Sequence, residues 1–126
     1  MGGYVKSILI VEDSTTTRSL IRAVIEELGD FNIVEAPTGF DALKLLPAQD
    51  FDLVVTDINM PDINGLELIN FVRSNQRYSN IPLIIVTTER SDEDKKRGMA
   101  LGATAYVTKP FKAPELQDVV RKVMNL

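Results

Sequence analysis

Residues able to bind a cation or a phosphoryl group follow four short apolar runs of this chain. The runs are residues 8–11, 53–56, 83–86 and 105–108, and the residues that follow them are Glu12, Asp13, Asp57, Thr87, Thr88 and Lys109. Continuous apolar runs of this length indicate strands of a parallel sheet buried on both faces. The carboxyl ends of such strands meet at one edge, where ligands bind. We therefore expect three acids, a hydroxyl and an ammonium group together, a set that suits a divalent cation and a phosphoryl group.

The three carboxylates favour a metal site over simple helix capping. At about 4 Å and an effective dielectric of 20, each pair of like charges costs on the order of 4 kcal/mol before screening. Mg²⁺ relieves that repulsion, because it takes carboxylate, carbonyl and water oxygens. Glu12 and Asp13 alone are equally explained as acids at a helix N-terminus. Asp57 follows a separate buried strand, so it shifts the interpretation towards the metal.

Lys109 has two interpretations beyond that of an ordinary surface lysine. It ends a strand beside the acids, where it can contact a phosphoryl group or simply form an ion pair with Asp57. The two roles are compatible, since a phosphoryl group can take over the pairing. Pro110 follows directly, so the bond between these residues is a candidate cis peptide.

The bulk composition limits the class of protein. The 126 residues suit one domain, expected to span residues 1–126 without an output domain, and 44% are hydrophobic. A net charge of −4 argues against nucleic-acid binding, and the mixed-charge segment 92–97 is interpreted as a solvated helix face. No run is long enough to span a membrane and no signal peptide is visible, so a cytoplasmic protein is expected.

The absence of cysteine and histidine restricts the chemistry further. Without cysteine there are no disulfides, thiolate metal sites or thiol catalysis. Without histidine the chain has no imidazole ligand and no histidine phosphoacceptor. A covalent phosphate must therefore reside on a carboxylate or a hydroxyl, and any phosphohistidine belongs to a partner.

Periodicity predicts five strands alternating with five helices. Strands are expected at 7–11, 31–36, 53–56, from Pro82, and at 103–108. The first helix should turn Leu20, Ile21, Val24, Ile25 and Leu28 inward, and a fourth helix containing Gly98 should start from a capping box at residues 91–94. Right-handed crossovers then favour the doubly wound, flavodoxin-like order 2-1-3-4-5. Its switch point lies between the strands that carry Glu12, Asp13 and Asp57.

Taken together, these pieces resemble the receiver domain of two-component response regulators, closest to the single-domain chemotaxis (CheY-like) type. The similarity covers essentially the whole chain. The matching pieces are residues 10–14 (Ile-Val-Glu-Asp-Ser), 56–61 (Thr-Asp-Ile-Asn-Met-Pro), Gly65, 87–88 (Thr-Thr), 102–103 (Gly-Ala), Tyr106 and 109–111 (Lys-Pro-Phe).

The resemblance implies a role for each site residue. Asp57 would accept phosphate from the phosphohistidine of a sensor histidine kinase. Asp13, Asp57 and the main-chain carbonyl of Asn59 would bind Mg²⁺, with Mn²⁺ as a substitute, and Glu12 would act through a metal-bound water. Lys109 and the Thr87 hydroxyl would contact phosphoryl oxygens. Such a protein catalyses its own phosphorylation and dephosphorylation and is not a turnover enzyme.

The resemblance also implies residues that tune and transmit the signal. Asn59 and Glu89 would orient the water that removes the phosphate, although both could be ordinary loop residues. Thr88 stands where the family usually has a small residue, so its bulk could slow small phosphodonors or a phosphatase. Thr87 would turn towards the phosphoryl group and admit Tyr106 inward, unless Tyr106 is a static edge residue.

The downstream protein target would then bind a face made of the fourth helix, fifth strand and fifth helix. The expected role is that of a chemotaxis regulator, a monomer for which dimerisation on phosphorylation stays open. A phosphorelay intermediate or a phosphate sink would use the same fold.

Two other classes fit the sequence less well. A phosphatase of the haloacid dehalogenase kind would need an acid at Asn59 and a cap insertion. A flavin-binding module would need a Ser/Thr/Gly-rich phosphate loop after the first strand, but the Ser and Thr residues at 14–17 come without a glycine, and tryptophan is absent.

Overall fold

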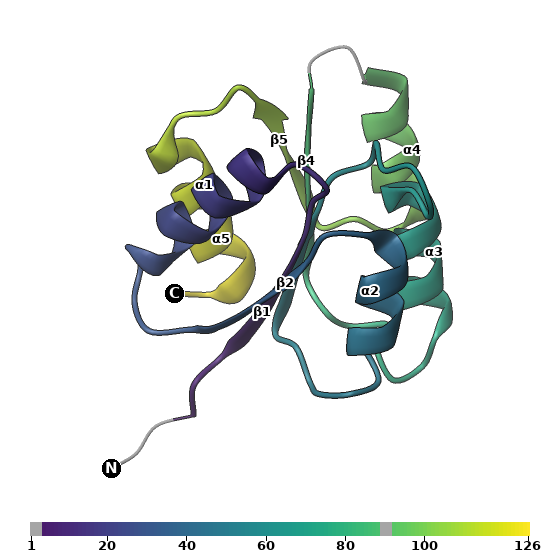
Figure 1. The fold of residues 1–126 in the computed structure, drawn as a ribbon, viewed down its shortest axis with the longest axis horizontal. Helices are drawn as coiled ribbons and strands as arrows, with labels where there is room; N and C mark the ends of the chain where they lie inside the picture. Colours follow the sequence, from purple (N-terminus) through teal and green to yellow (C-terminus); the bar gives the residue numbers. More distant parts are fainter. Residues whose placement is uncertain (1–3, 89–91) are drawn as a thin grey trace.

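The computed structural model describes residues 4–88 and 92–126. Strands and helices alternate along the chain, as Figure 1 shows: β1 (Ser7–Val11), α1 (Thr15–Glu26), β2 (Asn32–Ala36), α2 (Gly39–Leu45), β3 (Leu53–Thr56), α3 (Gly65–Ser74), β4 (Leu83–Thr88), α4 (Asp92–Leu101), β5 (Ala105–Lys109) and α5 (Ala113–Met124). Among these helices, none has the length and apolar character needed to cross a membrane.

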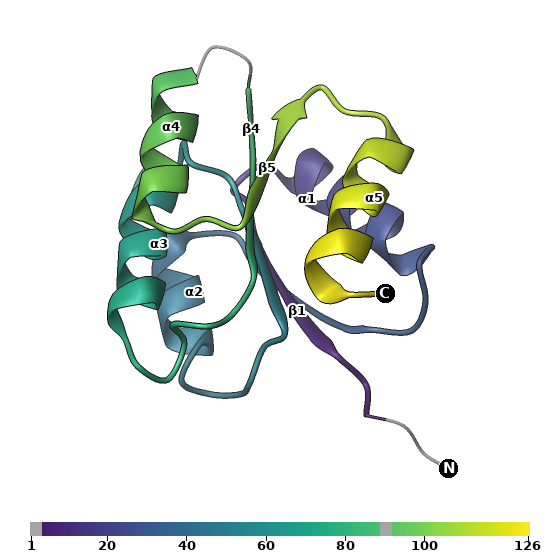
Figure 2. The same ribbon diagram turned by 180° about the vertical axis from the view of Figure 1, so that it is seen from behind.

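The strands form one parallel sheet in the order β2-β1-β3-β4-β5. Helices α1 and α5 cover one face, and α2, α3 and α4 cover the other, as the two opposite views show (Figures 1 and 2). The predicted doubly wound architecture is therefore confirmed. The switch point lies between β1 and β3, which pair directly with Val11 opposite Thr56.

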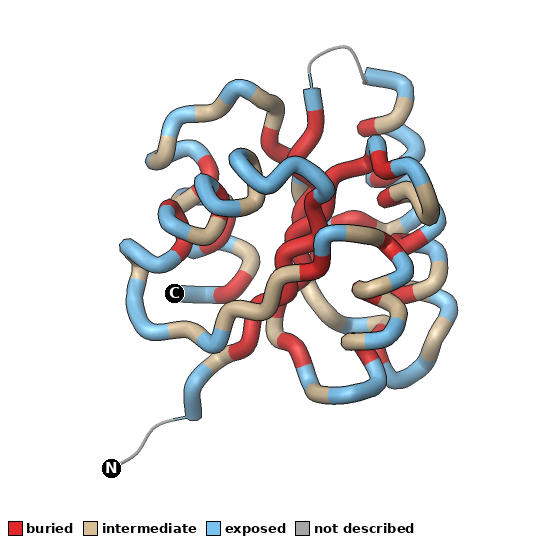
Figure 3. Tube along the Cα trace, viewed as in Figure 1, coloured by how far each residue is buried: buried red, intermediate tan, exposed pale blue. Residues whose placement is uncertain are grey.

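Burial on both faces explains why the strand sequences are continuously apolar. All five residues of β1 are buried, and the central strands lie in the buried centre of the molecule in Figure 3. Leu9 and Val11 pack in the cluster beneath α2 and α3. Ile8 and Ile10 pack in the cluster with residues of α1 and α5. Each such side chain contributes about 1.5–3 kcal/mol on burial, so the sheet fixes the strand ends firmly.

Side-chain caps set the starts of three helices. The Ser14 hydroxyl accepts the Thr17 N–H at α1, and the Thr38 hydroxyl accepts the Asp41 N–H at α2. At α3, Asn64 and Glu67 form a reciprocal capping box. Each cap satisfies a backbone donor that has no partner within its helix. The capping box expected at residues 91–94 lies partly outside the described residues.

One predicted inward residue and several predicted strand boundaries were wrong; β2 starts at residue 32 instead of 31, and β4 at residue 83 instead of 82. Leu20 was expected to face inward, but it is 49% exposed, because the buried stripe of α1 consists of Ile21, Val24 and Ile25. The fifth strand starts at residue 105 instead of 103. Here the Arg73 guanidinium donates to the Gly102 carbonyl at 2.8 Å, which holds the segment before β5 as a turn.

The prediction that residues 92–97 form a solvated helix face was wrong for Lys95. The Lys95 side chain is only 10% exposed, and its ammonium lies 2.8 Å from the Thr108 hydroxyl on β5. Helix α4 buries only Lys95 and Gly98 among its residues. Gly98 lies so close to β4 that a methyl group added at this position would collide with the Ile85 side chain. The apolar residues Met99 and Leu101 are each 39% exposed, so they do not anchor this helix.

Candidate functional site

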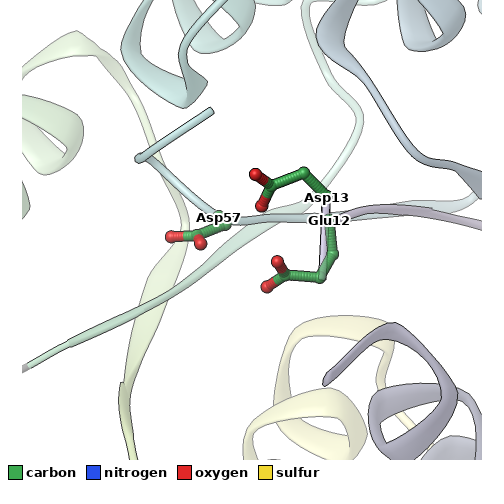
Figure 4. Close-up of side chains that lie close together, drawn as sticks. All are labelled: Glu12, Asp13 and Asp57. Atoms are coloured by element: carbon green, nitrogen blue, oxygen red, sulfur yellow. The ribbon is translucent and has the colours of Figure 1, made fainter. Parts of the chain in front are cut away.

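Three carboxylates converge where β1 and β3 end. Glu12 and Asp13 follow β1, Asp57 follows β3, and one ligand oxygen from each lies within 4.8 Å of the others. Figure 4 shows these side chains gathered in one place from the two chain segments. Glu12 and Asp57 are buried, whereas Asp13 is exposed. The cluster thus opens to solvent on the Asp13 side and is closed on the Glu12 side.

Lys109 joins this cluster from the end of β5. Its ammonium lies 2.7 Å from Glu12 Oε1 and 3.0 Å from Asp57 Oδ2. The Lys109 side chain is 18% exposed and that of Glu12 is 1% exposed. One ammonium therefore bridges two acids from different strands, whereas the ion-pair interpretation of the sequence named only Asp57. The bond between Lys109 and Pro110 is cis, the form for which the sequence made it a candidate.

Burial and pairing shift the proton equilibria of this bridge. Burial raises the pKa of Glu12, and the hydrogen bonds from Lys109 and the Ser14 N–H offset only part of that rise. Burial would lower the pKa of Lys109, but the hydrogen bonds to Glu12 and Asp57 outweigh it, so the pKa is raised. Both groups therefore hold protons more tightly than they would in water: Glu12 because burial disfavours its charged form, and Lys109 because the two carboxylates favour its charged form.

The two oxygens of Asp57 have different surroundings. Oδ1 accepts the N–H of Ile58 at 2.7 Å and the N–H of Asn59 at 3.3 Å. Oδ2 accepts the Lys109 ammonium at 3.0 Å. The main chain thus fixes one oxygen, and a side chain that can move holds the other. The carboxylate is oriented but not locked on both sides.

The donor set fits a hard divalent cation. The three acids offer only oxygen atoms, which Mg²⁺ prefers, and the exposed Asp13 leaves room for the waters that Mg²⁺ retains. The Asn59 main chain already lies against the Asp57 carboxylate through its N–H. Glu12, Asp13, Asp57 and Asn59, the four residues predicted as a metal site, thus come from adjacent segments.

Thr87 brings a buried hydroxyl to the neighbouring strand end. Thr87 is 0% exposed, and among residues 4–88 and 92–126 its Oγ1 has no hydrogen-bond partner. Thr56 pairs with Ile85 on β4, so Thr87 lies two residues beyond that point, towards the site edge. A buried polar atom left without a partner costs about 1–3 kcal/mol. This hydroxyl is therefore available to a group that enters the site.

The remaining predicted residues lie around the cluster. Thr88 is exposed and pairs in register with Lys109. A cavity of about 320 Å³ beside them is lined by Thr17, Leu20, Thr88, Lys109, Pro110 and Phe111, which gives a mostly apolar approach to the ammonium. Tyr106 on β5 is 47% exposed and faces outward. Glu89 lies outside the described residues, so its predicted partnership with Asn59 stays a prediction.

Arg18 supports the site and was missed in the sequence. From α1, it donates to the Glu12 main-chain carbonyl at 2.8 Å and to Glu35 at 2.9 Å. Arg22 reaches the other oxygen of Glu35 at 2.7 Å. The available clue was Glu35, the acid in the edge strand β2, together with two arginines spaced four apart in the first helix.

Comparison with known proteins agrees with this geometry. Residues 8–121 match the family model described as response regulator receiver domain. The chain therefore belongs to the response regulator receiver domain family. Receiver domains are signalling proteins of two-component systems, and they bind Mg²⁺ in an acidic pocket of the kind formed by Glu12, Asp13 and Asp57.

Several of the similar proteins are chemotaxis proteins. The chain is 37% identical to the chemotaxis protein CheY of Pseudomonas aeruginosa over 118 residues, which cover 94% of this chain and 95% of that protein. It is 35% identical to CheY-3 of Vibrio cholerae, covering 94% and 91% of the two chains. The solved structure of CheY4 from Vibrio cholerae superposes with a TM-score of 0.87 at 32% identity, covering 95% and 99%.

Proposed function

We propose that this protein is a phosphoacceptor that takes phosphate from a sensor histidine kinase onto Asp57 in the presence of Mg²⁺. The phosphorylated form presents a binding face to a downstream protein and then loses its phosphate by its own chemistry. The CheY relatives favour a role in chemotaxis. A relay or sink role would use the same site chemistry and differ only in the partner.

The observation that carries the proposal is the Lys109 bridge beside an unpartnered hydroxyl. Lys109 holds Glu12 and Asp57 at 2.7 and 3.0 Å, and among the described residues Thr87 Oγ1 has no partner. A phosphoryl group on Asp57 adds about −1.5 to −2 charges and three acceptor oxygens. The site thus holds in advance an ammonium and a hydroxyl that such a group needs.

The transfer step requires an oriented carboxylate more than covalent machinery. An Asp57 oxygen attacks phosphorus, and the new O–P bond forms as the P–N bond of the partner's phosphohistidine breaks. The electron pair stays on that ring nitrogen, and the ring leaves as neutral imidazole when its other nitrogen carries a proton. The Lys109 ammonium then pairs with the phosphoryl oxygens instead of the Asp57 carboxylate.

Mg²⁺ bound by Asp13, Asp57 and the Asn59 carbonyl would neutralise charge on the phosphoryl oxygens. Glu12, which is buried and already paired with Lys109, would contribute through a water. Hydrolysis removes the phosphoryl group: a water oxygen attacks phosphorus, the O–P bond to Asp57 breaks, inorganic phosphate leaves, and the carboxylate is regenerated. Asn59 beside Asp57 is suited to orient that water.

The output face would comprise α4, β5 and α5, with Tyr106 as its switch. Once Thr87 turns towards the phosphoryl oxygens, the aromatic ring can move from its exposed position into the vacated space. The sparse burial of α4 supports this assignment, since elements with few buried contacts rearrange at low cost.

Incubation with acetyl phosphate and Mg²⁺ tests the proposal. We expect one base-labile phosphate per chain, lost in Asp57→Asn and retained in Asp50→Asn, which removes an exposed acid from the loop before β3. Intact-mass spectrometry and peptide mapping provide the measurement. Continued turnover of many phosphate esters would instead indicate a phosphatase, and an unmodified Asp57 would reject the phosphoacceptor role.

Substitution of Asn59 should lengthen the phosphorylated state. We expect Asn59→Lys to slow phosphate loss on the order of tenfold, because misplacing the attacking water costs that much or more. Phosphate release after removal of the donor measures the decay, and Asn75→Lys, at the end of α3, serves as a matched control. Equal decay rates for wild type and Asn59→Lys would contradict the assignment.

A further inference from the structure

Lys95 occupies an unusual position between α4 and β5. Its ammonium donates to the Thr108 hydroxyl at 2.8 Å and lies 3.4 Å from Asp92 Oδ1. The same ammonium sits 5.2 Å from the centre of the Tyr106 ring. The Lys95 side chain is 10% exposed, whereas that of Asp92 is 83% exposed. A lysine is rarely buried to this extent without paired groups, so these contacts require an explanation.

The Tyr106 ring is one of three groups that hold this ammonium. Attraction to Asp92 is weakened by solvent, because exposed ion pairs contribute little. The Thr108 hydroxyl is a neutral acceptor. A ring within about 6 Å of a cation adds electrostatic attraction that grows as water is excluded. Alternate residues of a strand share a face, so Tyr106 and Thr108 meet Lys95 from the same side of β5.

We propose that Lys95 is a positioning residue that stabilises Tyr106 in its outward position. The inference rests on the proposed function, in which the ring moves inward on phosphorylation. Inward movement takes the ring off the ammonium while the bond to Thr108 keeps Lys95 in place. The cation therefore opposes switching in the unphosphorylated protein. Because coupling is reciprocal, removing the cation should also favour a phosphoryl-like ligand at Asp57.

The direct test measures the ring position without any phosphate. In protein labelled at tyrosine, NMR couplings and ring shifts report the Tyr106 side-chain rotamers. We expect Lys95→Met to raise the ratio of inward to outward ring about two- to fivefold, the range for a partly exposed cation–aromatic contact. Lys96→Met removes the same charge from the exposed neighbouring position and should leave the ratio unchanged. An unchanged ratio in Lys95→Met would overturn the proposal.

A double variant separates positioning from packing. Lys95→Met leaves the Thr108 hydroxyl without its donor, so the single variant should lose stability. Lys95→Met combined with Thr108→Val pairs two apolar groups and should recover thermal stability while keeping the shifted ring. A ring that returns outward in the double variant would show that Lys95 acts through packing alone, which would also overturn the proposal.

Titration with beryllofluoride and Mg²⁺ tests the coupling. We expect Lys95→Met to bind up to fivefold more tightly than wild type, in step with its ring shift. Equal affinity despite a shifted ring would refute the coupling. If no variant binds beryllofluoride, the phosphoacceptor proposal fails, whereas the rotamer ratio in the free protein still decides the role of Lys95.

Discussion

Replacement of Lys109 by methionine should reveal how much the central ammonium stabilises the fold. Methionine keeps most of the apolar length of lysine but removes the charge that bridges Glu12 and Asp57. Glu12 is only 1% exposed at its side chain, so its carboxylate cannot recover hydration. Removing one partner from a buried ion pair is destabilising because the other charge stays behind.

Protonation of Glu12 limits the size of the effect. At about 3 Å and an effective dielectric of 20, each contact of the bridge amounts to roughly 6 kcal/mol before desolvation is subtracted. The variant avoids that loss by binding a proton at Glu12, whose pKa is already raised from 4.5 by burial. Relative to the unfolded chain, where the carboxyl has its ordinary pKa of 4.5, holding that proton at pH 7 costs about 3.4 kcal/mol. We therefore expect the free energy of unfolding to fall by about 3 kcal/mol at that pH.

The pH dependence has a definite sign. In Lys109→Met the folded protein keeps a proton on Glu12 that the unfolded chain releases above pH 4.5. Stability of the variant should then fall as pH rises, by at most about 1.4 kcal/mol per unit. In the wild type the raised pKa of Lys109 stabilises the fold below 10.5, and this stability is lost as pH rises through the folded pKa. The variant lacks that contribution.

Urea unfolding between pH 5 and 8, first in a chelator and then with Mg²⁺, measures both effects. Mg²⁺ should stabilise Lys109→Met more than wild type, because no ammonium competes for the carboxylates; saturation at 100 times the dissociation constant adds about 2.7 kcal/mol. Lys122→Met, which removes an exposed lysine from α5, should behave like wild type. Equal pH slopes and equal Mg²⁺ responses for wild type and Lys109→Met would refute the reasoning.

Two further substitutions test the supports of the site, and a third serves as a comparison. Gly65→Ala should lower stability by about 3 kcal/mol and weaken Mg²⁺ binding, because the added methyl group collides with the Asp57 main chain; in Gly98→Ala the collision is with a flexible side-chain end, so calorimetry should show a smaller loss. Glu35→Gln should cost less than about 1 kcal/mol at pH 7. The hydrogen bond from Arg22 lowers the pKa of Glu35 against the effect of burial, so the difference should vanish as pH falls through that pKa; a constant difference between pH 7 and 3 would contradict it.

The topology of the sheet explains why most of the site could be predicted. In a parallel sheet, the end of each apolar run marks one shared edge, so order along the chain translates directly into proximity. Glu12, Asp13, Asp57 and Lys109 gather for that reason. The identity of the metal carbonyl and the water-orienting residues came only from family resemblance.

Long side chains that cross between elements escaped prediction. Arg18 reaches the Glu12 carbonyl from α1, Arg73 captures the Gly102 carbonyl from α3, and Lys95 enters from α4 to meet β5. The direction in which each of these side chains extends depends on an acceptor that comes close only in the folded protein. Charge patterns along the sequence predict that such residues face solvent. The predicted start of the fifth strand was wrong for a related reason, because the contact of Arg73 with Gly102 could not be predicted.

In the proposed function, strand β5 would connect the site to the output face through three of its residues. Lys109 contacts Asp57, Thr108 accepts the bond from Lys95, and Tyr106 covers the Lys95 ammonium. A charge change at Asp57 therefore acts on one end of a segment whose other end sets the exposure of an aromatic ring. Because α4 buries so few side chains, the contacts of Lys95 form a large part of its attachment to β5. Under the proposed function, phosphorylation would not have to deform the sheet to reach the output face; a redistribution of partners among Lys109, Thr108 and Tyr106 would be sufficient.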